Sequence, residues 1–254
     1  MYNLCLRADE KLTPGLEQQI DICSRLLIPN MEVNDGTTGG KSWTELSGAE
    51  LERYRSLLIR HHKKIVLLNA SKPLTEYDYY KKLFARALLL QVENVKVTVG
   101  EDGPVDEEEL DALRHVAELA RLHGIGIVIE NDSRTALSED RTLTAVYSRI
   151  KEYPVSIAFN PLEFVRTKAH PFFHVYYNSK LKGKVGFLRV NDGLFANGSA
   201  IVPGDGNAEV KELVSILLKR SYKGYFSFTP YMENTDEALF ALMLERFKKM
   251  LLEM

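Results

Sequence analysis

Cysteine is scarce in this sequence, whose 254 residues include only Cys5 and Cys23. The two are not arranged as a CxxC motif and have no metal-ligand spacing. Free cysteines of this kind are usually buried as small apolar residues, and they fit a reducing compartment. A disulfide-rich scaffold and a cysteine-based zinc site are therefore not expected.

Long apolar runs are also missing. No run approaches the roughly 20 residues that a membrane-spanning helix needs. The N-terminal residues enter an apolar strand-like run directly, without the charged and apolar regions of a signal peptide. We therefore expect a cytoplasmic protein that does not bind a membrane.

The sequence also lacks an excess of charge of one sign. The chain has 33 basic and 35 acidic residues, and its formal net charge is -2. A nucleic-acid-binding domain usually has a basic surplus or a basic stripe. The one dense basic cluster, at residues 61–64, follows a predicted helix, where cations complement the helix dipole. Nucleic acid is therefore not an expected partner.

Short apolar runs are abundant instead, and about eight of them recur at a spacing of roughly 30 residues. They are Tyr2–Leu6, Met31–Val33, Ile65–Leu68, Val95–Val97, Ile125–Ile129, Val155–Phe159, Val185–Leu188 and Tyr225–Phe228. Segments with helical periodicity separate them, and no Pro/Gly/Ser-rich linker divides the chain. This alternation predicts a single α/β domain over residues 1–254, a (β/α)₈ TIM barrel.

Polar residues directly follow almost every run, and in such a barrel the carboxyl ends of the strands converge on one site. These residues are Arg7, Asn34, Asn69, Thr98, Glu130, Asn160, Arg189 and Thr229. Two longer connections, residues 35–46 and 192–207, are expected on the same face. The first contains the only tryptophan, Trp43. This side chain could be a lid or a sugar-stacking platform, or it could anchor its loop to the barrel.

Three stretches of the sequence resemble the xylose-isomerase-like TIM barrels. They are residues 123–131 (HGIGIVIEN), residues 183–192 (GKVGFLRVND), and the turn at 203–206 (PGDG) with the later segment 222–230 (YKGYFSFTP). This group includes sugar phosphate isomerases and epimerases, and the resemblance covers essentially the whole chain. It implies one divalent ion held by Glu, Asp, His and Glu from four strand ends, where it stabilises an enediolate.

The chain departs from that ligand set at three of the four positions. Glu130 matches the first glutamate, but Asn160, Arg189 and Thr229 stand where Asp, His and Glu are expected. Asparagine and threonine are weak neutral ligands, and a guanidinium cannot bind a metal. We therefore expect a divergent barrel with a degraded metal site, without bound manganese, zinc or magnesium and without another cofactor.

An ion pair is a candidate replacement for the metal. Arg189 and Glu130 could form a bidentate pair that is purely structural, or one that joins Arg7 in binding a phosphorylated or carboxylated sugar-like ligand. The candidate catalytic residues are Glu130 and Arg189. The candidate substrate-binding residues are Arg7, Asn69, Asn160, Glu163, His170, Asn191, Thr229 and Trp43.

His170 and His174 are four residues apart, which suits a metal pair, but no HExxH motif accompanies them. Pro171 places His170 just outside a helix, so capping or surface roles are the alternative. With Glu163, His170 is also a candidate for acid–base chemistry at the mouth of the barrel.

Two classes of function remain open. The first is an isomerase- or epimerase-like enzyme that acts on a small sugar or sugar phosphate, with neutral donors or arginine stabilising the oxyanion. The second is a catalytically inactive barrel that binds a sugar-like ligand or serves as a protein-interaction module. A zinc-dependent DNA-repair nuclease would need a cluster of ligands that six scattered histidines do not supply. The sequence leaves open whether the chain forms a homo-oligomer.

Overall fold

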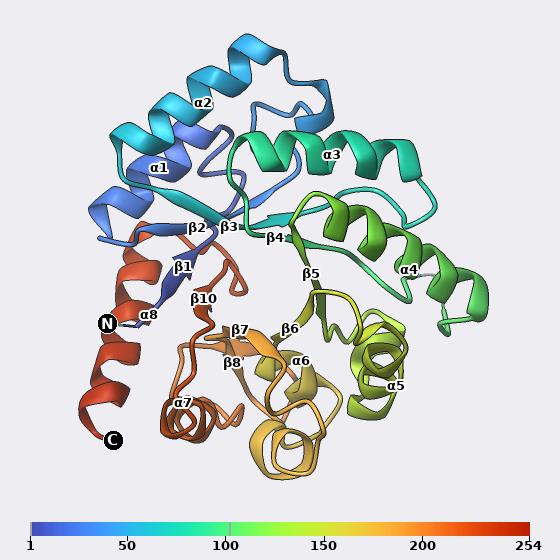
Figure 1. The fold of residues 1–254 in the computed structure, drawn as a ribbon. Coiled ribbons are helices and arrows are strands. Elements are labelled where there is room, and N and C mark those ends of the chain that lie inside the picture. The colour runs from blue at the N-terminus through green and yellow to red at the C-terminus, as the bar shows by residue number, and fades with distance from the viewer. Residues whose placement is uncertain (1, 102) are drawn as a thin grey trace.

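Eight parallel strands close into a barrel in the order β1-β10-β7-β6-β5-β4-β3-β2 (Figure 1). The structure is a computed structural model that describes residues 2–101 and 103–254. The barrel strands are β1 (Leu4–Leu6), β2 (Asn30–Asn34), β3 (Lys64–Asn69), β4 (Asn94–Lys96), β5 (Gly126–Glu130), β6 (Val155–Phe159), β7 (Val185–Arg189) and β10 (Tyr225–Phe228). Each apolar run of the sequence contributes a strand, so the predicted (β/α)₈ barrel is confirmed.

Helices surround the barrel on its outside (Figure 1). They are α1 (Leu16–Arg25), α2 (Gly48–Arg60), α3 (Tyr77–Leu89), α4 (Glu107–Leu122), α5 (Asp140–Ile150), α6 (Pro161–Arg166), α7 (Val210–Lys219) and α8 (Glu237–Leu252). Short helices lie in three connections: η1 (Trp43–Glu45), η2 (Ala136–Ser138) and the π-helix η3 (Pro171–Tyr176). In the described part of the chain, no helix is both long and apolar enough to cross a membrane.

The helix starts follow local capping chemistry. Ser47 forms a capping box with Glu50 at the start of α2, and the Asp106 side chain accepts the Glu109 N–H at the start of α4. These interactions satisfy backbone N–H groups that have no partner within the first helical turn.

Two apolar layers stabilise the fold. The larger lies between the strands and the helices, and the smaller fills the barrel interior. The interior cluster consists of Cys5, Val66, Leu67, Val128, Ala158 and Phe187, with Tyr225 packed against it. Toward the amino-terminal end, the Tyr225 hydroxyl donates to Glu93 Oε2 at 2.6 Å. Polar side chains therefore flank the apolar interior at both ends of the barrel.

The connection after β7 is organised by one buried carboxylate. Asp192, 1 % exposed, accepts the backbone N–H groups of Gly193, Gly204, Gly206 and Ala208 at 2.8–3.1 Å. Asp192–Gly193 (β8) also pairs with Ala200–Ile201 (β9) in a small antiparallel hairpin. The long loop at residues 192–207 thus has a fixed conformation at the carboxyl end of the barrel.

Candidate functional site

Arg189, the last residue of β7, lies at the centre of a buried ionic network with its side chain 2 % exposed. Its Nε and Nη2 donate to the two oxygens of Glu130 at 2.9 and 2.8 Å, a bidentate pair. Its Nη1 donates to Ser227 Oγ at 2.7 Å and to Glu32 on β2. The predicted contact between Arg189 and Glu130 is therefore present, and a second carboxylate joins it.

Glu32 and Lys96 are two members of this network that the sequence analysis missed. Glu32 is fully buried in the middle of β2, and Lys96 at the end of β4 donates to Glu130 Oε2 at 2.9 Å. Each charge stands inside a short apolar run, between Met and Val or between two valines. A charge flanked in this way on a buried strand was the available signal, because alternate residues face the barrel interior.

Arg7 and Asn69 complete the network from β1 and β3. Arg7 Nε lies 3.5 Å from Glu32 Oε1, and its side chain is 26 % exposed. Asn69 Nδ2 donates to Glu32 Oε1 at 2.9 Å and to Asn34 Oδ1 at 2.7 Å. Within residues 2–101 and 103–254, the buried atoms Arg7 Nε and Asn69 Oδ1 have no hydrogen-bond partner. A buried polar atom without a partner is costly, so both atoms are suited to a ligand or water.

Neutral polar groups extend the network around the other half of the mouth. Asn160, which precedes α6, donates from Nδ2 to Glu130 Oε1 at 3.1 Å. Asn191 donates to Asn160 Oδ1 at 3.4 Å, and the Thr229 hydroxyl donates to Asn191 Oδ1 at 3.4 Å. The structure thus brings Glu130, Asn160 and their polar neighbours together at the strand ends.

The charges in the network fix one another's protonation states. Burial alone would raise the pKa of the Glu130 carboxyl, but the Arg189 and Lys96 charges lower it well below its ordinary value. Burial likewise opposes ionisation of Glu32, and the Arg189 and Arg7 charges lower its pKa. Burial would lower the pKa of Arg189, but Glu130 and Glu32 raise it. All three side chains are therefore charged near neutral pH.

The donor set does not fit the divalent ion that the sequence resemblance implies. Glu130 already has two cationic partners, and the amide of Asn160 is a weak neutral ligand. The Arg189 guanidinium cannot bind a metal and repels one. Among the residues that the structure describes, no three His, Cys, Asp or Glu side chains form a group that could hold a metal ion.

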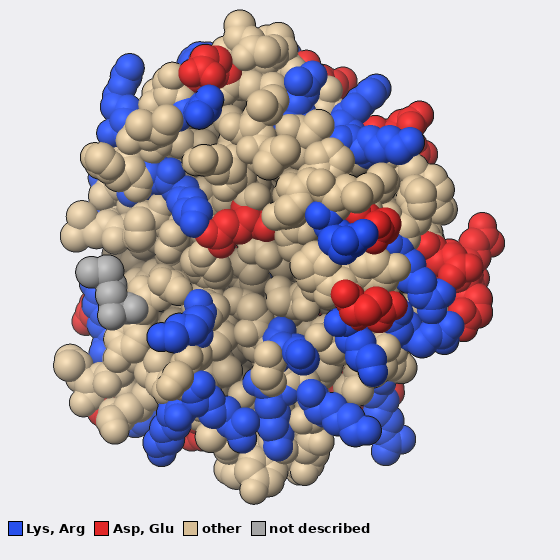
Figure 2. Space-filling model, viewed as in Figure 1, with Lys and Arg blue, Asp and Glu red and all other residues tan. Residues whose placement is uncertain are grey.

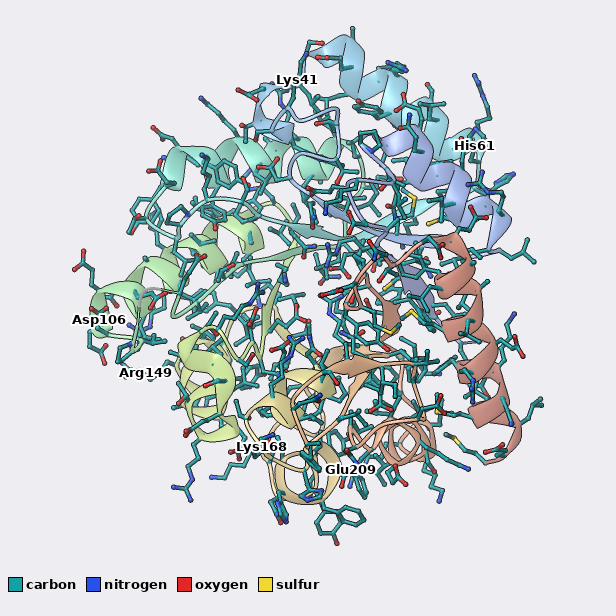
Figure 3. The ribbon with its side chains drawn as sticks, turned by 180° about the vertical axis from the view of Figure 1, so that it is seen from behind. Lys41, His61, Asp106, Arg149, Lys168 and Glu209 are labelled. Atoms are coloured by element: carbon teal, nitrogen blue, oxygen red, sulfur yellow. The ribbon has the colours of Figure 1, made fainter. Side chains whose placement is uncertain are left out.

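Two predicted site residues make contacts outside this network. Glu163, 7 % exposed, accepts the Ser133 backbone N–H at 3.1 Å and a bond from Arg166 at 2.6 Å. His170 Nδ1 lies 2.9 Å from Glu209 Oε1. Figure 3, which views the carboxyl ends of the strands, shows Glu209 outside the ring of strands. His170 therefore contacts Glu209 at the periphery and does not join the charges at the mouth.

Trp43 is fully buried, so in this structure it is not an exposed platform for sugar stacking. Its backbone N–H donates to Asp35 Oδ1 at 2.6 Å. Asp35 also accepts the hydroxyls of Ser71 and Tyr79, each at 2.7 Å. Asp35 therefore joins the loop after β2 to Ser71 and to α3, and the burial of Trp43 fits the role of an anchor for this loop.

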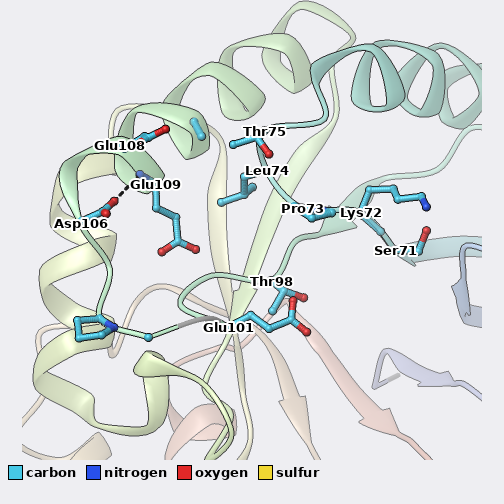
Figure 4. A pocket seen from close by; sticks show the side chains of 14 residues that line it. Ser71, Lys72, Pro73, Leu74, Thr75, Thr98, Glu101, Asp106, Glu108 and Glu109 are labelled. Carbon is cyan, nitrogen blue, oxygen red and sulfur yellow. Dashed lines mark hydrogen bonds between the residues drawn. The ribbon is translucent and has the colours of Figure 1, made fainter.

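A pocket of about 540 Å³ lies between the connections that follow β3 and β4 (Figure 4). Thr98, one of its lining residues, stands two positions after Lys96 in the sequence. The other polar lining side chains are Ser71, Lys72, Thr75, Glu101, Asp106, Glu108 and Glu109. Carboxylates and hydroxyls of this kind are hydrogen-bonding partners for a polyhydroxylated molecule.

Comparison with solved structures identifies the fold. The IolI protein with a bound zinc atom superposes with a TM-score of 0.77 at 13% identity, covering 97% of both chains. The chain has the fold of the xylose isomerase-like TIM barrels. A xylose isomerase domain protein from Planctomyces limnophilus gives a TM-score of 0.76 at 12% identity, covering 98% of this chain and 96% of that one. A D-tagatose 3-epimerase-like protein gives 0.72 at 18% identity, covering 98% and 97%. No family model matches, and no curated protein matches in sequence.

At these identities the similarity establishes the fold alone, and it agrees with the resemblance drawn from the sequence. The neighbours include proteins described as epimerases and one described as a probable dehydratase. The individual roles of the site residues in this barrel are predictions.

Proposed function

We propose that this barrel binds a small anionic sugar-like ligand, a sugar phosphate or sugar acid, at the carboxyl-terminal mouth without a divalent ion. The observation that carries the proposal is the charge balance of the buried network. Three cations, Arg7, Lys96 and Arg189, face two carboxylates, Glu32 and Glu130. Among these five side chains one positive charge is in excess, in surroundings where a charge acts more strongly than in water. The exposed Glu10, whose Oε1 accepts the Asn34 Nδ2 hydrogen bond at 2.6 Å, lies outside this buried group.

The accessible members of the network are the ones suited to hold the ligand. Arg7 and Lys96 have side chains 26 % and 25 % exposed, whereas Arg189 is 2 % exposed. The atoms Arg7 Nε and Asn69 Oδ1 are buried and have no hydrogen-bond partner among the described residues. The anionic group would contact Arg7 and Lys96, and the hydroxyl groups would extend into the pocket beside Thr98.

A second candidate is isomerase- or epimerase-type proton transfer by Glu130, which the folds of the neighbours and the place of this residue at the end of β5 favour. A carboxylate with a strongly lowered pKa is a weak base for removing a carbon-bound proton. An anionic ligand that draws Lys96 away would raise the pKa of Glu130 and make it a stronger base. Ligand binding comes first in this proposal because it needs no such rearrangement.

Isothermal titration calorimetry with ribose 5-phosphate, glucose 6-phosphate, gluconate and neutral glucose tests the proposal. We expect saturable binding of at least one anionic compound, and no binding of glucose at the same concentration. Arg7→Gln and Lys96→Gln should each weaken binding by about tenfold, the effect of losing one charge-assisted hydrogen bond. Arg53→Gln, which alters an exposed ion pair between α2 and α1, is the matched control and should not change affinity.

Elemental analysis by inductively coupled plasma mass spectrometry tests the absence of a resident ion. Stoichiometric manganese, zinc or magnesium in the purified protein would overturn the metal-independent part of the proposal. Failure of every anionic compound to bind would overturn the ligand class and favour the protein-interaction alternative. Conversion of a bound sugar phosphate, abolished by Glu130→Gln, would establish the enzymatic candidate.

A further inference from the structure

Basic side chains that are distant in the sequence gather at the opposite, amino-terminal end of the barrel. Figure 2 shows this face, with Lys and Arg concentrated over β6, β7 and α7. The turns that lead into β6, β7 and β10 supply the amino-terminal basic patch, which consists of Lys151, Lys180, Lys182, Lys184, Arg220 and Lys223. Only the fold brings these three turns together, so the sequence alone does not reveal the patch.

The patch cations are grouped together and have no carboxylate partner in the described part of the chain, unlike several arginines on the helices. Arg53, Arg121 and Arg149 on the helices each form an ion pair at 2.5–2.6 Å. Within the described residues, no carboxylate lies within 4.0 Å of a patch cation, although the exposed Glu152 is adjacent in sequence to Lys151. Helix dipoles favour cations after α5 and α7, which accounts for Lys151 and Arg220.

The three lysines before β7 follow a turn rather than a long helix, so no helix dipole accounts for them. Lys182 Nζ lies 4.9 Å from the centre of the Tyr177 ring, and Lys184 Nζ lies 6.0 Å from that of Tyr147. Like charges close together repel one another and do not stabilise the fold. In TIM barrels the amino-terminal face usually contributes to stability rather than to catalysis. A group of cations on this face, without carboxylate partners among the described residues, is suited to an anionic ligand.

A shallow pocket of about 440 Å³ lies within the patch, at the start of β5, β6 and β7. Lys151 and Lys184 contribute its charges, and Tyr147, Tyr153 and Ser156 contribute hydroxyl groups. Gly186 gives the Ser156 hydroxyl its room, because a Cβ at this position would lie 2.5 Å from Ser156 Oγ. Lysine is a common partner of phosphate, and the volume suits a small molecule.

The geometry points to a second ligand site in this pocket, for a small phosphorylated molecule whose phosphate binds between Lys151 and Lys184. The site lies at the other end of the barrel from the Arg189 network, and it does not depend on what binds there. Inorganic phosphate, pyrophosphate and the phosphate of a metabolite share this chemistry.

Titration calorimetry with pyrophosphate, phosphate and fructose 1,6-bisphosphate tests this site and distinguishes the sources of the phosphate. We expect saturable binding of at least one of them, weakened by at least about tenfold in the Lys151→Gln/Lys184→Gln protein. Lys82→Gln, at an exposed position on α3, is the matched control and should keep the wild-type affinity. Arg7→Gln should also keep it, which separates this site from the mouth.

Amide chemical shifts localise the binding. In ¹H–¹⁵N spectra, pyrophosphate or the phosphate compound that binds most tightly should move the signals of Gly183 and Gly186, which line the pocket. Wild-type affinity in the double variant, equal weakening by Lys82→Gln, or no saturable binding at millimolar concentration would each overturn the inference. If Arg7→Gln loses phosphate binding and the double lysine variant keeps it, the phosphate binds at the mouth, and the inference is overturned as well.

Discussion

Replacement of Arg189 by methionine tests whether the network depends on this one cation. Methionine keeps much of the length of the side chain but removes its charge. Glu32, which is fully buried, would then retain the charges of Arg7, at 3.5 Å, and of Lys96, together with the hydrogen bonds of Asn69 and Ser227. Glu130 would keep Lys96 and Asn160.

The expected loss of stability is large. Removing one partner of a buried ion pair destabilises a protein by about 3–5 kcal/mol, because the other charge stays buried without compensation. For a chain of this size each kcal/mol lowers the melting temperature by roughly 2–4 °C, so the decrease should be about 6–20 °C. Arg121→Met removes an exposed pair with Glu118 on α4 and should cost less than about 1 kcal/mol.

The dependence of stability on pH should also change sign. In the wild type the pKa values of Glu32 and Glu130 are lowered, so their stabilising contribution is present above about pH 4.3 and is lost as the pH falls through the folded-state values. In Arg189→Met, burial should raise the pKa of Glu32 above its unfolded value. The variant should then lose stability as the pH rises from about 5 to 8, where the wild type stays constant.

Urea unfolding followed by circular dichroism at pH 5, 6, 7 and 8 measures both effects. Arg189→Met/Glu32→Gln should recover part of the lost stability, because it removes the uncompensated charge. A variant within about 1 kcal/mol of the wild type at pH 8, with the same pH profile, would refute the reasoning. If Arg189→Met does not fold, failure of the double variant to fold would contradict it as well.

Three further outcomes follow from contacts elsewhere in the barrel. Asp192→Ala should lower the free energy of unfolding by about 2–4 kcal/mol and speed amide exchange of Gly204 and Gly206, because several buried N–H groups lose their acceptor. Gly206→Ala should cost about 1–3 kcal/mol in the same unfolding assay, since its Cβ would lie 2.6 Å from the Gly193 carbonyl oxygen. Acrylamide should quench the fluorescence of the buried Trp43 weakly, whereas Asp35→Ala should loosen its loop and increase quenching.

The fold was predictable because its signals are local and repeated. A strand buried on both faces is a short apolar run in the sequence, as at Ile125–Ile129. In the helices between these runs, apolar residues recur with the helical spacing of three to four residues. Local chemistry also marks the start of α2, where Ser47 and Glu50 have the spacing of a capping box and form one.

The site was predictable only in part because strand ends are not its sole contributors. Arg189 and Glu130 stand at strand ends and meet as predicted. Glu32 enters from the middle of β2, and its contact with Arg189 joins residues far apart in the sequence. Burial of Trp43 likewise depends on Asp35 and the loop after β3, a tertiary arrangement that composition does not reveal.

The central cation of this barrel is part of the polypeptide. A bound ion has a dissociation constant, so its occupancy follows the metal supply and can be reversed by a chelator. Arg189 has none, and its guanidinium stays charged at every pH that the fold tolerates. Every folded copy of this chain therefore carries the positive charge between Glu32 and Glu130, and only a mutation can remove it.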